Sequence, residues 1–234
     1  MKHFFSAFFL SVAISFFCTD SMAQNCDDSS INLGVISDHW VYRNKSFKLN
    51  MQLPEGWYLF DYPATEKKYL RIGSDYSKMS SVLFDNAPDA GPTVDIGQIK
   101  PLPVEYALTV LSLAKLQDTA DVVLSGNEIQ QNYTVSLRVA YADTSGEDNF
   151  LKAFYKKLTR QQNKEAEIKE GKLGDLNYKY ILLHSTTKSG VAENRIFGIK
   201  NFGCVDLIIR MTYDTDADLS VINDVFKELK MDSQ

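Results

Sequence analysis

The chain has 234 residues, of which 44% are hydrophobic and 24% are charged, and its formal net charge is −5. A chain of this length buries about 70% of the surface that its unfolded form exposes, so its core needs no metal ion or dense disulfide network. The acidic balance argues against a nucleic-acid-binding protein, because such proteins gather Lys and Arg against the phosphates.

Residues 1–23 have the three parts of an export signal. A positive start at Lys2 precedes an apolar run, Phe4 to Cys18, and a small-x-small ending at Ala23. The run is shorter than the roughly 20 residues of a membrane-spanning helix, and its ending is typical of a cleaved signal peptide. We therefore expect a secreted or periplasmic protein, cleaved after Ala23, that does not span a membrane. An uncleaved anchor is the alternative.

Removal of the signal leaves Cys26 and Cys204 as the cysteines and His39 and His184 as the histidines. Exported proteins meet an oxidising environment, so the two remaining cysteines suggest a Cys26–Cys204 disulfide. Such a bridge would join the N-terminal segment to a late strand. The alternative is a pair of free thiols, with Cys204 buried as a small apolar side chain.

The first predicted elements after the signal are strands. Residues 24–39 are polar and expected to be flexible, and a single domain is expected from 40 to 234. From Phe47 to Leu53 apolar and polar residues alternate, which predicts a half-buried strand. Further strands are expected at 57–62, 69–72 and 79–84. Residues 104–116 are rich in Ala and Leu and follow two prolines, which predicts a helix.

The second half of the domain is expected to combine two helices with a strand meander. Residues 133–141 alternate as a strand, and the apolar residues from Leu151 to Leu158 recur as in an amphipathic helix that ends near Gln162. Four strands follow, at 166–172, 177–185, 193–201 and 204–213. Their short connections favour antiparallel pairing. A last helical stripe runs from Leu219 to Leu229. Together these elements predict an α+β fold in which helices flank a twisted antiparallel sheet.

Both ends of this domain are similar to a known family. Near the start, Tyr42-Arg43-Asn44 and Phe47-Lys48-Leu49 lead into Leu53-Pro54-Glu55-Gly56-Trp57. Near the end, a strand at 205–213 is followed by Asp214-Thr215-Asp216 and by a helix that finishes in Phe226-Lys227-Glu228-Leu229-Lys230-Met231. This arrangement resembles PsbP-like domains over residues 40–233. The resemblance implies an antiparallel sheet flanked by helices, in a superfamily of mostly binding or assembly proteins rather than enzymes.

Aromatic residues occupy both faces of the strand that is predicted to begin at Trp57. Tyr58, Phe60 and Tyr62 fall on one face, and Trp57 falls on the other. Exposed aromatic side chains mark binding surfaces, so these four residues are the candidate partner or ligand surface. The alternative is a strand that other elements cover on both sides.

Sequence motifs of catalysis and metal binding are missing. The sequence has no Gly-x-Ser-x-Gly elbow, no His-Glu-x-x-His, no P-loop and no Gly-x-Gly-x-x-Gly. Asp214, Asp216 and Asp218 resemble the start of a calcium loop, but the positions that need Gly and Glu hold Leu219 and Val225. Asp216 or Asp218 is instead expected to cap the last helix. We predict no catalytic residue, no metal site and no cofactor.

One predicted helix region is locally basic. Its basic residues are Lys152, Lys156, Lys157, Arg160 and Lys164. Either a solvated helix face or a docking surface for an acidic partner or an anionic membrane explains them. The whole sequence predicts an exported, non-enzymatic binding or assembly protein of the cell envelope, whose partner is another envelope protein or a small apolar ligand. The alternative is an envelope hydrolase that uses carboxylates or an unrecognised Ser.

Overall fold

The structure is a computed structural model. It describes residues 30–60, 68–78, 92–99, 107–117, 121, 123–126, 131–142, 146–162, 166–186 and 192–231. The predicted signal peptide with its cleavage point and the strand predicted at 79–84 lie outside these residues.

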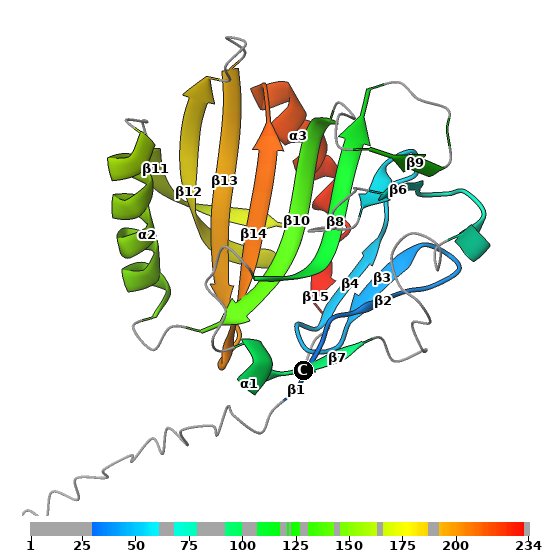
Figure 1. Ribbon diagram of the computed structural model, residues 1–234, viewed down its shortest axis with the longest axis horizontal. Helices are drawn as coiled ribbons and strands as arrows, with labels where there is room; N and C mark the ends of the chain where they lie inside the picture. The colour runs from blue at the N-terminus through cyan, green and yellow to red at the C-terminus, as the bar shows by residue number, and fades with distance from the viewer. Residues whose placement is uncertain are drawn as a thin grey trace, which may run out of the picture.

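A nine-stranded antiparallel sheet dominates the fold (Figure 1). In spatial order its strands are β11 (Ala166–Leu173), β12 (Leu176–Thr186), β13 (Ala192–Asn201), β14 (Val205–Tyr213), β10 (Gln131–Tyr141), β8 (Leu108–Leu116), β5 (Tyr58–Phe60), β6 (Lys68–Arg71) and β9 (Val123–Ser125). The four consecutive strands β11 to β14 pair antiparallel with their neighbours in chain order, so the predicted meander is confirmed. The strands expected at 57–62 and 69–72 correspond to β5 and β6, which pair antiparallel with each other.

Two smaller sheets are built mainly from the beginning of the domain. The four-stranded sheet has the order β15 (Lys230–Met231), β4 (Leu49–Gln52), β3 (Val41–Asn44) and β2 (Val35–Ile36). The other sheet pairs β1 (Ser30–Asn32) with β7 (Thr93–Asp95). Part of the segment expected to be flexible, residues 24–39, therefore forms β1 and β2. A short 3-10 helix, Tyr76–Lys78, precedes β7 in the chain.

Three helices are present among the described residues: α1 (Ile96–Ile99), α2 (Glu147–Gln162) and α3 (Asp216–Phe226). Figure 1 shows α2 on one side of the large sheet, beside β11 and β12, and α3 on the other side. On the α2 face, Leu151 and Leu158 pack against apolar side chains of β12 and β13. On the α3 face, Ile222 and Phe226 join the main core between the large sheet and β4. The predicted helix ending near Gln162 is confirmed.

Two expectations about the fold were wrong. Residues 104–116 do not form a helix where they are described, because Leu108–Leu116 is strand β8, paired with β10 and β5. The fold class was wrong too: the described residues are mostly strand, so a helix-flanked α+β fold of the PsbP-like kind is not what the chain adopts. Periodicity misled because β8 is apolar on both faces, and a buried strand of this kind gives the same pattern as a buried helix.

The N-terminus of α3 is closed by a capping box. Thr215 is the N-cap, and its hydroxyl oxygen accepts a hydrogen bond from the Asp218 backbone N–H at 3.3 Å. The Asp218 carboxylate in turn accepts a hydrogen bond from the Thr215 N–H at 2.8 Å. The capping residue is thus Thr215, and Asp218 completes the box from the third helical position.

Thr215→Ala is expected to lower the free energy of unfolding by about 1 kcal/mol, because the N–H of Asp218 loses the Thr215 hydroxyl as an acceptor. Urea denaturation followed by circular dichroism measures the change. Ser220→Ala, at an exposed position inside the same helix, is the control and is expected to leave stability unchanged or slightly raised. Equal stabilities of the two variants would contradict the capping role.

Candidate functional site

The aromatic residues singled out in the sequence are core residues wherever the structure describes them. Trp57 is 4% exposed and packs against Tyr133, with 5.2 Å between ring centroids. Tyr58 and Phe60 are buried on the opposite face of the sheet, where Phe60 contacts Tyr69. Both faces of β5 are therefore covered, and these three side chains offer no surface to a partner. Tyr62 lies outside the described residues.

Of the cysteines and histidines that remain after removal of the signal, the structure describes Cys204, His39 and His184. Cys204 is 8% exposed and disulfide-bonded. The other two cysteines, Cys18 and Cys26, lie outside the described residues, so the pairing of Cys204 with Cys26 stays a prediction. His184 is exposed, and its Nδ1 atom lies 2.7 Å from the Asn194 side-chain oxygen. The described part of the chain contains no group of three His, Cys, Asp or Glu side chains that could hold a metal ion.

A hollow of about 490 Å³ opens between the N-terminal end of α2 and the strands β11, β12 and β13; we call it the α2 hollow. Its lining residues are Glu147, Glu170, Gly171, Lys172, Asn177, Tyr178, Lys179 and Lys200. The lining thus includes three lysines and two glutamates in a protein whose overall charge is negative.

Strand register explains why these charges gather. Side chains of a strand alternate between the two faces of the sheet. In β12, Ile181 and Leu183 face α2 and lie in its apolar cluster. Lys179 continues the same face toward the end of the strand, directly opposite Glu170 of β11. The apolar pattern therefore ends where α2 begins, and charged residues take over the face.

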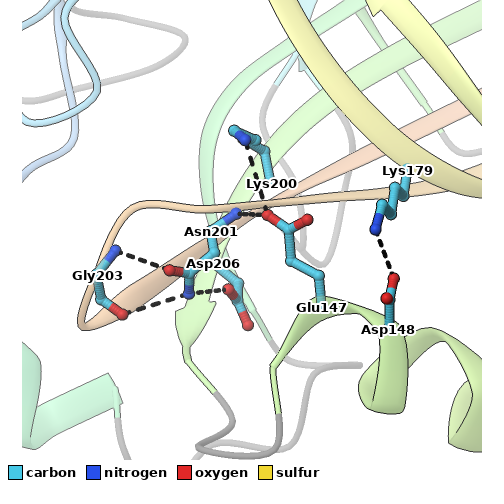
Figure 2. A network of polar contacts seen from close by, with 7 residues as sticks. All are labelled: Glu147, Asp148, Lys179, Lys200, Asn201, Gly203 and Asp206. Atoms are coloured by element: carbon cyan, nitrogen blue, oxygen red, sulfur yellow. Dashed lines mark hydrogen bonds and ion pairs between the residues drawn. The ribbon is translucent and has the colours of Figure 1, made fainter.

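A network of polar contacts fixes the rim of the hollow, as Figure 2 shows. The Glu147 Oε1 atom accepts a hydrogen bond from the Asn201 backbone N–H at 2.6 Å and lies 3.9 Å from the Lys200 ammonium. The Asn201 side-chain amide donates to the Asp206 carboxylate at 2.7 Å, and its oxygen accepts from the Gly203 N–H at 3.0 Å. These contacts tie the first turn of α2 to the β13–β14 hairpin.

The lysines of the hollow differ in how strongly they are paired. The Lys179 ammonium donates to Asp148 Oδ1 at 2.6 Å, and this hydrogen bond lowers the pKa of the Asp148 carboxyl and raises the pKa of Lys179. Among the described residues, the ion-pair contact of Lys200 is the longer one with Glu147, at 3.9 Å. Within the described part of the chain, Lys172 has no carboxylate at ion-pair distance. Lys172 and Lys200 are therefore the lysines best able to receive a ligand's charge.

A smaller hollow of about 260 Å³ lies along β13 and β14 and includes Arg195, Phe197 and Arg210 in its lining. The Arg195 guanidinium donates to one Glu193 oxygen through Nε at 2.6 Å and through Nη2 at 2.5 Å. The Arg210 guanidinium carbon lies 5.7 Å from the centre of the Phe197 ring, and Phe197 in turn packs against Phe154 of α2. These arginines already serve internal contacts, so the α2 hollow is the better candidate.

The lysines of the α2 hollow were missed by sequence reasoning. They come from three different strands and share no motif. The one feature noticed nearby was the basic helix, of which Lys152, Lys156, Lys157 and Arg160 are exposed and Lys164 lies outside the described residues. Asp214, Asp216 and Asp218 belong to no group of described residues that could hold a metal ion. Asp218 is part of the capping box of α3.

Comparison with known proteins adds little. No family model and no curated protein matches the chain. A crystal structure of a protein from Bacteroides thetaiotaomicron VPI-5482 is similar over 89% of this chain and 50% of that chain, with 9% sequence identity and a TM-score of 0.39. The chain therefore spans about half the length of that protein. A likeness this distant carries neither a fold nor a function to the chain. Among the described residues no helix is long and apolar enough to cross a membrane.

Proposed function

We propose that the protein is an exported, non-enzymatic binding protein of the cell envelope and that the α2 hollow holds a small molecule bearing phosphate or carboxylate groups. The observation that carries the proposal is the meeting of Lys172, Lys179 and Lys200 in one hollow of a protein whose net charge is −5. The export signal predicted in the sequence supports the location.

The size and lining of the hollow support an anionic ligand over the apolar one that the sequence suggested. A volume of about 490 Å³ falls within the range of small-molecule sites. Lysine ammonium groups are compact charges that suit phosphate and carboxylate oxygens. Glu147 and Asp148 already occupy the first turn of α2, where the helix dipole favours negative charge. Recognition of the ligand therefore rests on the lysines rather than on the helix end.

Isothermal titration calorimetry with inorganic phosphate and with citrate tests this proposal. Wild-type protein is expected to bind at least one of them saturably. Lys172→Gln and Lys200→Gln are each expected to weaken binding about ten- to hundredfold, since a lost charged hydrogen bond costs about 1.5–3 kcal/mol. Lys227→Gln, at an exposed site beyond the end of α3, is the matched control and should bind like the wild type. Saturable binding by neither probe, or equal binding by all four proteins, would refute the proposal.

A further inference from the structure

The exposed face of α2 is a separate charged surface, which we call the α2 basic face. It consists of Lys152, Lys156, Lys157 and Arg160, all exposed. Lys152, Lys156 and Arg160 follow one another at intervals of four residues, so they lie in one line along the helix. At 1.5 Å per residue this line is about 12 Å long. A stretch of concentrated positive charge thus faces outward from a protein of net charge −5.

Little negative charge opposes the α2 basic face from the elements around it. Asp148, on the same helix, pairs with Lys179 of β12 at 2.6 Å. Glu147 turns toward the backbone of Asn201 and toward Lys200. On the neighbouring strand β11, Glu170 lines the α2 hollow. Asp148 also acts on the charge of Lys152, and Lys157 makes a contact of its own, whereas Lys156 and Arg160 have no carboxylate at ion-pair distance within the described part of the chain.

The apolar face of α2 is already packed against the large sheet. Leu151, Phe154 and Leu158 pack against the large sheet. An amphipathic helix that inserts into a membrane does so with its apolar face, so α2 is not able to insert while the domain is folded. Any attachment through this helix is electrostatic and remains at the surface of the partner.

The composition of the face decides between kinds of partner. A specific protein interface has an apolar core with aromatic anchors at its centre. Among the α2 side chains whose exposure is described, the exposed apolar one is the small Ala153, and the larger Phe150, Phe154 and Tyr155 are half-buried and packed on the apolar cluster under the helix. A charged surface without pockets, such as a layer of lipid headgroups, needs no apolar anchor and attracts each nearby Lys or Arg.

We propose that the α2 basic face docks the protein on an anionic phospholipid surface. The helix lies flat on the headgroups, with the line from Lys152 to Arg160 against the phosphates. Contact of this kind is reversible and weakens with salt, because it is made of exposed charges. The proposal is independent of the α2 hollow, whose lysines are on strands.

Co-sedimentation with lipid vesicles at low ionic strength tests the docking. Wild-type protein is expected to bind vesicles of equimolar phosphatidylcholine and phosphatidylglycerol, and to remain in solution with pure phosphatidylcholine vesicles. The triple variant K152E/K156E/R160E is expected to lose at least a hundredfold in vesicle affinity. The variant K152Q/K156Q/R160Q, which removes the charges without reversing them, should lose at least tenfold in vesicle affinity. It keeps the test valid if the charge-reversed variant misfolds, and circular dichroism checks the fold of both.

The matched control reverses the same number of charges elsewhere. Lys45, Lys227 and Lys230 are exposed and lie away from α2, so K45E/K227E/K230E gives the same net charge and is expected to retain vesicle binding. Lys172→Gln should bind vesicles like the wild type, which separates this surface from the α2 hollow. Absence of wild-type binding to acidic vesicles, equal loss in the α2 and control triple variants, or equal binding to both lipid compositions would overturn the proposal.

Discussion

Gly174→Ala is expected to lower the free energy of unfolding by about 3 kcal/mol, through a positive φ and a steric clash. Gly174 begins the two-residue turn between β11 and β12, at φ +59°. A Cβ atom added there would lie 2.3 Å from the Leu229 carbonyl oxygen and 2.5 Å from the Phe226 carbonyl oxygen. Both obstacles are backbone atoms, so no side-chain rotation relieves the contact.

A substitution at a second glycine separates the cost of the positive φ from the cost of the steric clash. Gly146, which precedes α2, has φ +81°, and no described atom lies within 4 Å of a Cβ added there. Gly146→Ala is therefore expected to lose only about 1–2 kcal/mol, the cost of the left-handed backbone. Urea denaturation of both variants, at unchanged m-value, measures the difference. Equal losses of stability in the two variants would show that the backbone around Gly174 moves to accept a Cβ atom, and that its close approach to the segment after α3 contributes nothing to stability.

The turn at Gly174 matters because it connects α3 to the strands that bear the α2 hollow. The Asp175 N–H donates to the Leu229 carbonyl oxygen at 2.9 Å, so the chain beyond α3 rests on the β11–β12 hairpin. The same hairpin carries Lys172 and Lys179 of the hollow. Loosening the turn is therefore expected to weaken ligand binding as well as stability.

Strands that are exposed on one face could be predicted from the sequence. The alternation from Phe47 to Leu53 corresponds to β4, where Leu49 and Met51 are buried and Gln52 is exposed. β10 was found for the same reason. The four strands of the meander were found with ends that differ by one or two residues, although the last of them, β14, is buried on both faces. The helix α2 was found because its buried residues, such as Leu151 and Leu158, recur at helical spacing.

Strand β8 shows where such reasoning fails. Leu113 belongs to the core on the α3 face, and Ala114 belongs to the cluster around Tyr58 on the other face. A strand buried on both sides has no polar alternation to reveal its period. Its content of Ala and Leu also favours a helix. Pairing with β10 on one side and β5 on the other decides its structure, and these partners are distant in sequence.

The candidate site was beyond prediction for a related reason. Lys172 and Lys179 share the α2 face through the register of β11 and β12, and a shift of β12 by one residue would move Lys179 to the other face. Lys200 joins them from the last residues of β13, next to Ile199, which pairs with Lys179. The aromatic residues from Trp57 onward were visible in the sequence. Whether they are exposed depends on strands that cover them and that lie much later in the chain. Local patterns thus revealed the strands, and register determined the site.

Loss of the Cys204 disulfide is expected to be the most damaging single change. Cys204 lies in the β13–β14 turn, directly before β14, and its carbonyl oxygen accepts a hydrogen bond from the Ala142 N–H at 3.0 Å. Next to it, Phe202 packs on Phe47 with 5.1 Å between ring centroids, which joins the hairpin to the segment that leads into β4. With Cys26 as its partner, the bridge closes a loop that spans most of the chain, and such a loop contributes about 4–5 kcal/mol in the chain-entropy model.

Cysteine variants of the chain beginning at Gln24 test both the size of this contribution and the pairing. Cys204→Ala, Cys26→Ala and the double variant are each expected to lose the same stability, because all three remove one bond. Chemical denaturation without reductant measures the losses, and addition of dithiothreitol should bring the wild type to the level of the variants. Wild-type stability in Cys26→Ala would exclude Cys26 as the partner. A loss in the double variant equal to the sum of the single losses would show that the two cysteines act independently.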